Sequence, residues 1–473
     1  MKTSLSSIAA VSAVALLSSA TAASAAPTTT TTSRTAATTT AQRAHAELAR
    51  DQRIGQLFMV ATPVDSVSPG LRQVVRDQHV GNVILMGRTT KGANHVRSVS
   101  TSVQQLTESR AATNRIPSFV SADQEGGQVQ VLRGTGYSEM PSAVRQGRQS
   151  RDSLRSDVRR WGTQMSRSGV NTNLAPVLDV VPTADKATNE PIGQLDREYG
   201  STAAAVTEKG GAFRYGMRGA GVATTVKHFP GLGRVKGNTD TTKGVKDTVT
   251  TADDANLAPF ASAADGNTPF VMMSSATYTK IDATQPALFS PKVIDSVLRG
   301  SLGYDGIVMT DDVGNAKAVQ DWTPAERATK FIDAGGDMVL TARTDTLPQM
   351  VAAVKKKAAA DPAFAQKVDE ASLRVLEGKE EAGLLGMRLT ASGTYSSWTT
   401  KRLQDWLGRD RSGRLDSATI RSLQYRIGTP TTGRMDARSF RDLQTYLGMS
   451  RNGTTHWDSS TVRRLQRYLN TQL

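Results

Sequence analysis

The sequence contains no cysteine, which excludes disulfides, Cys-ligated zinc, iron–sulfur clusters and thiol nucleophiles. Its five histidines lack the close spacing of a metal site, so we expect no metal and no cofactor. Aromatic residues make up only 5% of the chain, and no apolar run reaches the roughly 18–20 residues of a membrane span. What is present in excess is positive charge: the 473 residues carry a formal net charge of +15, and this length allows two or three domains.

The N-terminus has the pattern of an export signal. Lys2 provides a positive n-region, residues 8–17 form a short apolar stretch, and an Ala-Ser-Ala cleavage site stands at 23–25. We therefore expect residues 1–25 to be a signal peptide, followed by a Thr/Ala-rich linker over 26–44. A membrane anchor is the alternative, but the apolar stretch is short and interrupted by serine.

Export also bears on the choice of partners. A secreted protein, extracellular or associated with the cell wall, is not expected to meet nucleic acid, whereas its positive charge suits anionic wall polymers. No cysteine follows the cleavage site, which excludes a lipoprotein, and we expect no membrane association after cleavage.

Short apolar runs recur through residues 45–388, each followed by a helix-like stretch. Most are apolar throughout, which is typical of parallel strands buried on both faces. We predict eight strands, at 57–61, 80–86, 118–122, 170–178, 222–227, 270–274, 306–310 and 338–340. This count and length predict an α/β fold, a (β/α)8 TIM-like barrel, followed by a small all-α repeat domain. A doubly wound open sheet is the alternative, but no GxGxxG follows the first strand.

Polar side chains follow five of these strands, where a barrel places its chemistry. Each alone could cap the next helix. Together they provide several carboxylates around one cavity, which suits hydrolysis of a glycosidic bond by paired acids. The set comprises Asp123, Glu125, Asp179, Lys227, His228, Ser274, Ser275, Asp311 and Asp312.

The motifs around these residues resemble those of glycoside hydrolase family 3, particularly its single-barrel β-N-acetylglucosaminidase (β-N-acetylhexosaminidase) type. Five segments match in order and span nearly the whole body: SADQEGG at 121–127, NLAPVLD at 173–179, REYG at 197–200, KHFPG at 227–231 and IVMTDD at 307–312. The resemblance implies a retaining β-glycosidase that forms a covalent glycosyl-enzyme intermediate.

The resemblance also implies roles for individual residues. The family nucleophile falls on Asp311, which leaves Asp312 to cap a helix beginning near Gly314. The implied contacts to sugar hydroxyls are made by Asp123, Arg197, Lys227 and His228. For Lys227 and His228, a structural ion pair at the barrel rim is the alternative.

The proton donor is where the match breaks. The family loop after KHFPG carries an Asp-Ser-His triplet whose His is the acid/base, but here Asn238, Thr239 and Asp240 take those positions. A carboxylic acid can donate the proton if burial or a nearby anion raises its pKa, so Asp240 is the leading candidate. An Asx turn is the alternative use of Asp240. Glu125 is the reserve candidate.

Two further departures lie at the sugar-binding rim. Ser275 stands where family members often have His, and Gln128 where they commonly have Arg. These differences leave the exact sugar open. The larger β-glucosidase branch usually takes its acid from a second α/β domain, and nothing after residue 388 resembles one.

The tail, residues 391–473, is predicted to be a separate helical repeat. Leu-Gln recurs at 403–404, 423–424, 443–444 and 465–466, and the best copies are GRLDSATIRSLQ at 413–424 and GRMDARSFRDLQ at 433–444. Aspartates at 416, 436 and 458 stand at N-cap positions, so each unit is one short helix and a turn that must stack on its neighbours. The pattern resembles actinobacterial peptidoglycan-binding repeats.

The tail is also strongly basic. It holds 14 Lys and Arg against 6 Asp, a net charge of +8. Its three tryptophans, Trp398, Trp406 and Trp457, either offer surfaces for stacking on sugars or pack the small helical core. We expect this module to bind peptidoglycan or an anionic wall polymer.

Together these features predict a secreted exo-glycosidase that removes terminal β-linked N-acetylglucosamine from glycans or peptidoglycan fragments. A β-glucosidase or other exo-glycosidase on the same barrel is the second possibility. A wall-binding protein that has lost its acid is the third, and the missing loop histidine favours it.

Overall fold

The computed structural model describes residues 39–470 except 267, 386–388, 390 and 410–411. The predicted signal peptide and residues 26–38 of the predicted linker lie outside the described residues. In the described part of the chain, no helix combines the length and apolarity needed to cross a membrane.

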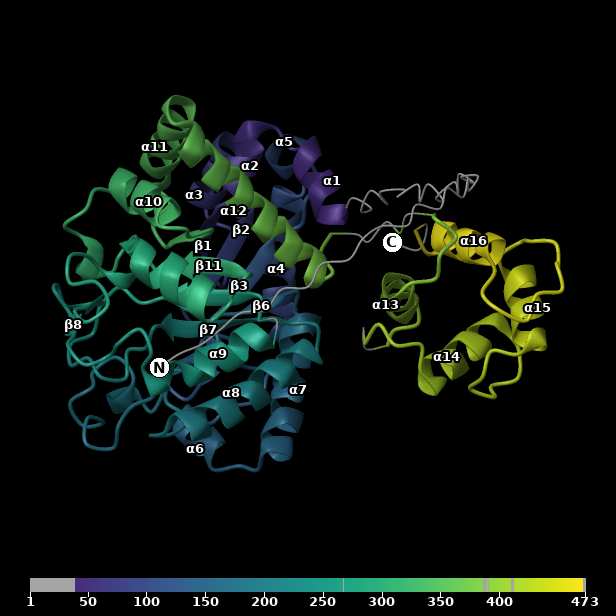
Figure 1. The fold of residues 1–473 in the computed structure, drawn as a ribbon, viewed down its shortest axis with the longest axis horizontal. Coiled ribbons are helices and arrows are strands. Elements are labelled where there is room, and N and C mark those ends of the chain that lie inside the picture. Colours follow the sequence, from purple (N-terminus) through teal and green to yellow (C-terminus); the bar gives the residue numbers. More distant parts are fainter. Residues whose placement is uncertain (1–38, 267, 386–388, 390, 410–411, 471–473) are drawn as a thin grey trace, which may run out of the picture. The chain divides into compact units, whose positions relative to one another are not determined.

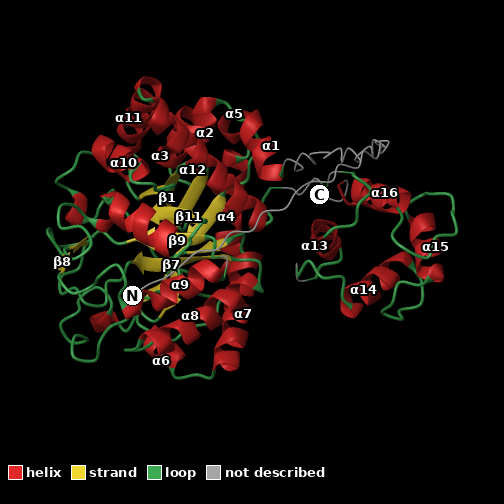
Figure 2. Cartoon of the chain, in the orientation of Figure 1, coloured by secondary structure: helices red, strands yellow, loops and turns green. Residues whose placement is uncertain are grey.

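Eight parallel strands form the centre of the first region, with helices around them (Figure 2). Their order in the sheet is β11-β9-β7-β6-β3-β2-β1-β12, and a bridge between Met309 and Met338 joins the two ends. The predicted barrel is therefore confirmed. The strands are β1 (Phe58–Pro63), β2 (Asn82–Met86), β3 (Phe119–Ala122), β6 (Thr172–Asn173), β7 (Ala223–Phe229), β9 (Phe270–Met273), β11 (Ile307–Thr310) and β12 (Val339–Thr341).

Only the fourth strand differs strongly from its prediction. The apolar run over 170–178 predicts a long strand, but β6 holds just two residues. Pro176 has no N–H to donate to a neighbouring strand, so regular pairing stops before it. Val177 then makes a single bridge to Lys227.

Each barrel strand is followed by a helix on the outside of the barrel (Figure 1). After β1, β2, β3 and β6 come α3 (Pro69–Gln78), α4 (Ala93–Thr107) with α5 (Arg110–Thr113), α6 (Ala143–Gly147) with α7 (Arg151–Arg167), and α8 (Ala203–Arg218). After β7, β9, β11 and β12 come α9 (Ala258–Asp265), the π-type helix η4 (Lys292–Ser301), α10 (Pro324–Asp333), and α11 (Leu347–Ala360) with α12 (Pro362–Glu381). Short 3-10 turns are η1 (Gly193–Leu195), η2 (Ala255–Leu257), η3 (Ala287–Phe289) and η5 (Lys317–Val319).

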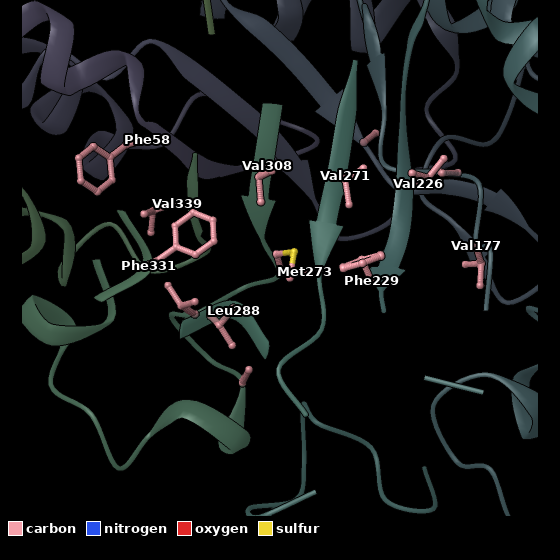
Figure 3. Packing of buried hydrophobic residues seen from close by; sticks show 14 of the residues in the cluster. Phe58, Val177, Val226, Phe229, Val271, Met273, Leu288, Val308, Phe331 and Val339 are labelled. Carbon is pink, nitrogen blue, oxygen red and sulfur yellow. The ribbon is translucent and has the colours of Figure 1, made fainter. Parts of the chain in front are cut away.

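Side-chain alternation divides the strand residues into two apolar layers. One set fills the barrel interior, where the rings of Phe119 and Phe270 meet edge to face at 4.8 Å. The other set points outward under the helices, as Val226, Val271 and Val308 do on three neighbouring strands (Figure 3). The closed, filled barrel gives the loops at its carboxyl end a rigid base.

Two pairs of very short strands lie in the loops after barrel strands. They are β4 (Gln124–Gly126) with β5 (Val129–Gln130), and β8 (Lys246–Asp247) with β10 (Thr277–Tyr278). The first pair contains the DQEGG segment, and the second ties the loop after β7 to the loop after β9. Both therefore stabilise loops that carry predicted site residues.

The barrel unit begins before the predicted boundary at residue 45. Helix α1 (Thr40–Glu47) precedes α2 (Arg50–Gln56), and the Thr39 side chain caps the first turn of α1. The carboxylate of Glu380 accepts hydrogen bonds from the backbone N–H groups of Thr40 and Ala41, at 3.2 and 3.0 Å. The last part of the predicted linker is thus an ordered, capped helix, because Glu380 satisfies N–H groups that a helix start leaves open.

The described residues of the tail form four helices, as its repeats predict. They are α13 (Ser397–Trp406), α14 (Ser417–Ile427), α15 (Ala437–Tyr446) and α16 (Ser459–Asn470). Asp416 and Asp436 cap α14 and α15, each accepting from a backbone N–H at 2.7 Å. Buried leucines, among them the leucine of every Leu-Gln pair, make up the core that the four helices share.

The glutamine of each Leu-Gln pair fastens its helix to the turn that precedes the next one. Gln404 accepts from the N–H of Gly413 at 2.9 Å, and Gln424 repeats this contact with Gly433 at 2.8 Å. Gln444 does the same with Asn452 at 3.2 Å. The fourth glutamine reaches back to the beginning, since Gln466 accepts from the N–H of Gly393 at 3.1 Å. The four repeats therefore close into a ring rather than an open stack.

The described tryptophans of this module pack against its core. Trp406 and Trp457 are both partly buried against the shared leucines. Trp457 also meets Phe440 edge to face at 5.2 Å and Tyr395 at 4.2 Å. The side chain of Trp398 lies outside the description.

Candidate active site

Strand alternation directs three of the predicted site residues into the barrel mouth. Phe119, Ala223 and Met309 point into the interior. Asp123, Lys227 and Asp311 stand an even number of residues further along β3, β7 and β11, so their side chains leave the strands on the same inner face. They form a polar layer above the apolar filling.

Lys227 lies at the centre of a charged network in this layer. Its ammonium group contacts Asp123 Oδ1 and Glu125 Oε1, both at 2.7 Å. Arg197 binds the same Glu125 with two nitrogens, at 2.8 and 2.9 Å. Lys227 and Glu125 are buried, whereas Asp123 keeps 26% of its side chain exposed. The network holds Asp123 toward the open mouth.

This network decides the protonation of Glu125. Burial alone would raise the pKa of Glu125, but the charges of Arg197 and Lys227 outweigh it and hold that pKa well below its usual range. A carboxylate so stabilised in its ionised form is a poor proton donor. The geometry therefore assigns Glu125 to positioning its two cations and disfavours it as the acid.

The two glycines of DQEGG make this placement of Glu125 possible. Gly126 and Gly127 have φ values of 109° and 57°, and a Cβ on Gly126 would lie 2.3 Å from the carbonyl oxygen of Pro141. Any side chain there would push the loop away from the mouth.

His228 is oriented by a buried carboxylate. Its Nδ1 lies 2.8 Å from Asp179 Oδ2, while its backbone N–H and that of Leu232 donate to Asp179 Oδ1 at 3.0 and 2.8 Å. Asp179 is completely buried. An N–H on Nδ1 facing this acceptor leaves Nε2 as the nitrogen available to a substrate.

The two carboxylates after β11 have different surroundings. Asp312 accepts from the backbone N–H groups of Gly314 and Ala342 at 2.9 and 2.8 Å, so it ties the loop after β11 to the end of β12. Residues 313–315 form a turn, and the short 3-10 helix η5 that follows begins at Lys317 with Ala316 at its N-cap, so the prediction that Asp312 caps a helix is wrong. Asp311 accepts a hydrogen bond from the neighbouring N–H of Asp312, at 2.8 Å.

The loop that carries Asp240 is fastened to the loop after β11. The backbone carbonyl groups of Thr239 and Asp240 accept from the N–H groups of Ala318 and Lys317, at 3.0 and 3.1 Å. Lys243 forms an ion pair with Asp321 in the same neighbouring loop. These contacts place Asp240 beside the loop of Asp311.

Glu190 anchors the other side of this loop. Its backbone N–H donates to the carbonyl oxygen of Lys236 at 3.0 Å, and its carboxylate accepts from the N–H of Asn238 at 3.0 Å. The Asx turn in the loop is made by Asn238, whose side chain accepts from the N–H of Asp240 at 2.9 Å. The turn therefore does not require the carboxyl group of Asp240.

The charge of Asp311 changes the acidity of Asp240. Repulsion from Asp311 is the main cause that raises the pKa of Asp240 to about 6; desolvation contributes less, and Asp240 is an exposed residue. A carboxyl group with a raised pKa beside a second carboxyl group is an arrangement suited to acid/base chemistry. The missing loop histidine is thus matched by an aspartic acid able to hold a proton near neutral pH.

Ser275, at the position of the family histidine, is buried at the carboxyl end of β9. Within the described ranges, its hydroxyl group has no hydrogen-bond partner. A buried hydroxyl without a partner is costly, so a bound sugar that supplied one would gain from it.

A pocket of about 300 Å³ opens at the carboxyl ends of β1, β2 and β12. Met86, Ala342 and Thr344 are among its lining residues, and the N–H of Ala342 donates to Asp312. Between residues 39 and 470, gaps aside, no group of three or more His, Asp or Glu side chains is arranged to hold a metal ion.

The fold and the site together define a class of protein. A parallel barrel with paired carboxyl groups and a set of charged hydrogen-bonding side chains at its carboxyl end is suited to the hydrolysis of glycosides.

Known proteins support this class. Residues 49–377 match the family described as the N-terminal domain of glycosyl hydrolase family 3, and the chain belongs to this family. A β-hexosaminidase of Xanthomonas oryzae pv. oryzae is 28% identical over 356 residues, which is 72% of this chain and 97% of that protein. One of Alkalilimnicola ehrlichii is 33% identical over 277 residues, 57% of this chain and 75% of that protein.

Two solved structures are similar across the barrel. The β-N-acetylhexosaminidase of Beutenbergia cavernae is 47% identical, with a TM-score of 0.70 over 71% of this chain and 99% of that chain. A family 3 β-N-acetylglucosaminidase of Paenibacillus sp. str. FPU-7 is 28% identical, with a TM-score of 0.66 over 74% of this chain and 65% of that one.

The sequence does not indicate every residue that shapes the site. Asp179 belongs to the polar set at strand ends, but nothing in the pattern marks it as the partner of His228. Glu190 lies 48 residues from Asn238 in the chain, and no motif signals their contact. Contacts of this kind depend on how the barrel loops fold back.

Proposed function

We propose that this chain is a retaining exo-glycosidase that releases terminal β-linked N-acetylglucosamine. The observation that carries the proposal is the place of Asp240, whose loop is fastened by backbone hydrogen bonds beside the loop of Asp311. Repulsion from Asp311 also raises the pKa of Asp240 to about 6. Asp240 can then hold a proton for the leaving group, and Asp311 is the carboxylate placed to attack.

In the first step, Asp311 attacks the anomeric carbon while Asp240 gives its proton to the glycosidic oxygen. The leaving group departs as an alcohol, and a covalent glycosyl-enzyme remains. In the second step, Asp240 takes a proton from water, which attacks the same carbon and regenerates free Asp311.

The charged groups around the pair would hold the sugar. Asp123 faces the mouth and can accept hydrogen bonds from hydroxyl groups, while Arg197, Lys227 and His228 can donate or share them. Lys227 and His228 are held in place by ion pairs with carboxylates of the barrel. Their contacts therefore agree both with a structural ion pair at the rim and with hydrogen bonding to the sugar. The names of the similar proteins support an N-acetylhexosamine in this place.

Hydrolysis of an aryl β-N-acetylglucosaminide, compared with an aryl β-glucoside, tests the activity. We expect the first to be the better substrate and Asp311→Ala to abolish its turnover. Asp305→Ala is a matched control, because Asp305 is exposed at the opposite end of the same strand. Preference for the glucoside would favour a β-glucosidase on this barrel. Turnover of neither would favour a binding protein without catalysis.

We also propose that the protein is exported and remains associated with the cell wall through its basic module. The export pattern over 1–25 and the net charge of +8 over 391–473 support this. Fractionation of producing cells should find the protein with the wall, with Ala26 as its first residue. A cytoplasmic protein that begins at Met1 would contradict the proposal.

A further inference from the structure

Four equivalent positions of the helical ring come together in space. The residue two places after the glutamine of each Leu-Gln pair is Trp406, Arg426, Tyr446 and Tyr468 in turn. The rings of Trp406 and Tyr446 are 5.8 Å apart, those of Trp406 and Tyr468 5.4 Å, and those of Tyr446 and Tyr468 5.7 Å. The guanidinium of Arg426 lies 5.1 Å from the centre of the Trp406 ring. We call these four residues the axial cluster.

Closure of the ring explains why the axial cluster forms. Each of its members follows the buried leucine of its repeat by three residues, so it stands beside the core stripe of its helix. In an open stack the first and fourth helices would be far apart, whereas the contact of Gln466 with Gly393 brings them together. Trp406 from α13 and Tyr468 from α16 can then touch.

The axial cluster lies at the surface rather than inside the core. Arg426 is exposed and 38% of Tyr446 is accessible, while Trp406 and Tyr468 are partly buried. The two tyrosine hydroxyl groups are 3.1 Å apart. The rings are inclined to one another by 56° to 83°, so they present edges and faces in several directions instead of one flat sheet.

This chemistry fits a sugar with an acidic group close beside it. Aromatic faces are electron-rich and attract the C–H bonds of a pyranose ring, and tyrosine hydroxyl groups can bind its polar edge. An arginine beside them binds a carboxylate with two parallel hydrogen bonds. A polyanion without sugar rings would use the arginines of the module but would gain nothing from three clustered aromatic side chains.

We propose that the axial cluster is the site at which the module binds peptidoglycan, with its aromatic side chains against an amino sugar and Arg426 on a carboxylate of the peptide attached to that sugar strand. This inference rests on the wall association proposed above and adds the site and the class of ligand. One ring would present one such site, at the place where its four repeats meet.

Sedimentation of the full-length mature protein with insoluble peptidoglycan tests the proposal. The peptidoglycan is used both before and after removal of its covalently attached anionic polymers. We expect Tyr446→Ala and Arg426→Gln each to weaken binding at least tenfold on both preparations. Tyr425→Ala is the matched control, because Tyr425 is 82% exposed on the same helix turn as Arg426 and should bind like the original protein. Circular dichroism and hydrolysis of the aryl substrate establish that each variant is folded.

The possible outcomes distinguish a failure of this inference from a failure of the proposed wall association or of the proposed hydrolytic activity. If the original protein binds peptidoglycan and Tyr446→Ala binds equally well, the axial cluster is not the site, although wall association stands. Binding that disappears when the anionic polymers are removed would also overturn the inference, since the ligand would then be the polymer. If the original protein does not bind either preparation, wall association itself is wrong, and the hydrolytic activity is judged by its own assay.

Discussion

Replacing Asp240 by alanine should slow hydrolysis by an amount that depends on the leaving group. General acid catalysis typically contributes about 10²–10⁴-fold, which corresponds to about 3–5 kcal/mol of transition-state stabilisation. A sugar alcohol cannot leave without a proton, so a disaccharide substrate should show the full loss. An activated aryl group leaves as a stable anion, and its release needs Asp240 much less.

The second step gives a more specific signature. Without Asp240 no base activates water, so with an activated aryl substrate the variant should accumulate glycosyl-enzyme after a rapid burst. Added azide needs no base, and it should restore turnover and yield the glycosyl azide with retained configuration. Thr242→Ala, in the same loop and exposed, should behave like the original protein on both substrates.

The pH profile provides an independent check of the same residue. Asp240 acts as an acid only while it is protonated, and repulsion by Asp311 raises its pKa to about 6. Activity on a disaccharide should therefore fall as the pH rises above this value, and Asp240→Ala should lose that limb. An Asp240→Ala protein that keeps the limb, hydrolyses both substrates normally and ignores azide would refute the reasoning.

Three further substitutions test the surroundings. Glu125→Gln removes the anion shared by the buried Lys227 and the partly buried Arg197, so we expect a loss of about 3–5 kcal/mol in the free energy of unfolding, measured by urea denaturation; an unchanged value would show that the network is dispensable. Asp179→Asn should reduce kcat/KM by up to about 10²-fold, because His228 loses its anionic partner and its fixed orientation, and a variant with normal kinetics would contradict that role. Gln424→Leu leaves the N–H of Gly433 without its acceptor and should cost about 1–3 kcal/mol in the module; faster hydrogen exchange at this amide is the measurement, and unchanged protection would argue against the glutamine clamp.

The barrel could be predicted because its strands carry a strong local signal. Runs such as 57–61 are apolar throughout, and the number and spacing of the predicted strands already limit the architecture. Prediction failed where one residue changes the backbone: Pro176 ends the fourth strand early within an apolar run. Prediction also missed the helix that begins after Thr39. A threonine in a threonine-rich segment does not stand out as an N-cap, and the start of this helix is further stabilised by Glu380, which is distant in the sequence.

The candidate site likewise contains residues that the local sequence predicts and contacts that it does not predict. Asp123, Lys227 and Asp311 follow from strand ends and alternation, which are properties of the local sequence. The contacts that fix Asp240 do not, because Ala318 and Glu190 approach its loop from other parts of the barrel. In the tail, the repeat spacing predicts the helices, but it carries no indication that Gln466 closes the ring.

Covalent trapping of the nucleophile tests the central claim most directly. A 5-fluoro glycosyl fluoride with the 2-acetamido-2-deoxy-β-gluco configuration should form a long-lived intermediate, because fluorine destabilises the transition state of the second step. Digestion and mass spectrometry of the trapped protein should locate one sugar on Asp311, and Asp311→Ala should remain unlabelled. A label on another residue, or turnover of an aryl β-N-acetylglucosaminide with inversion at the anomeric carbon, would contradict the account.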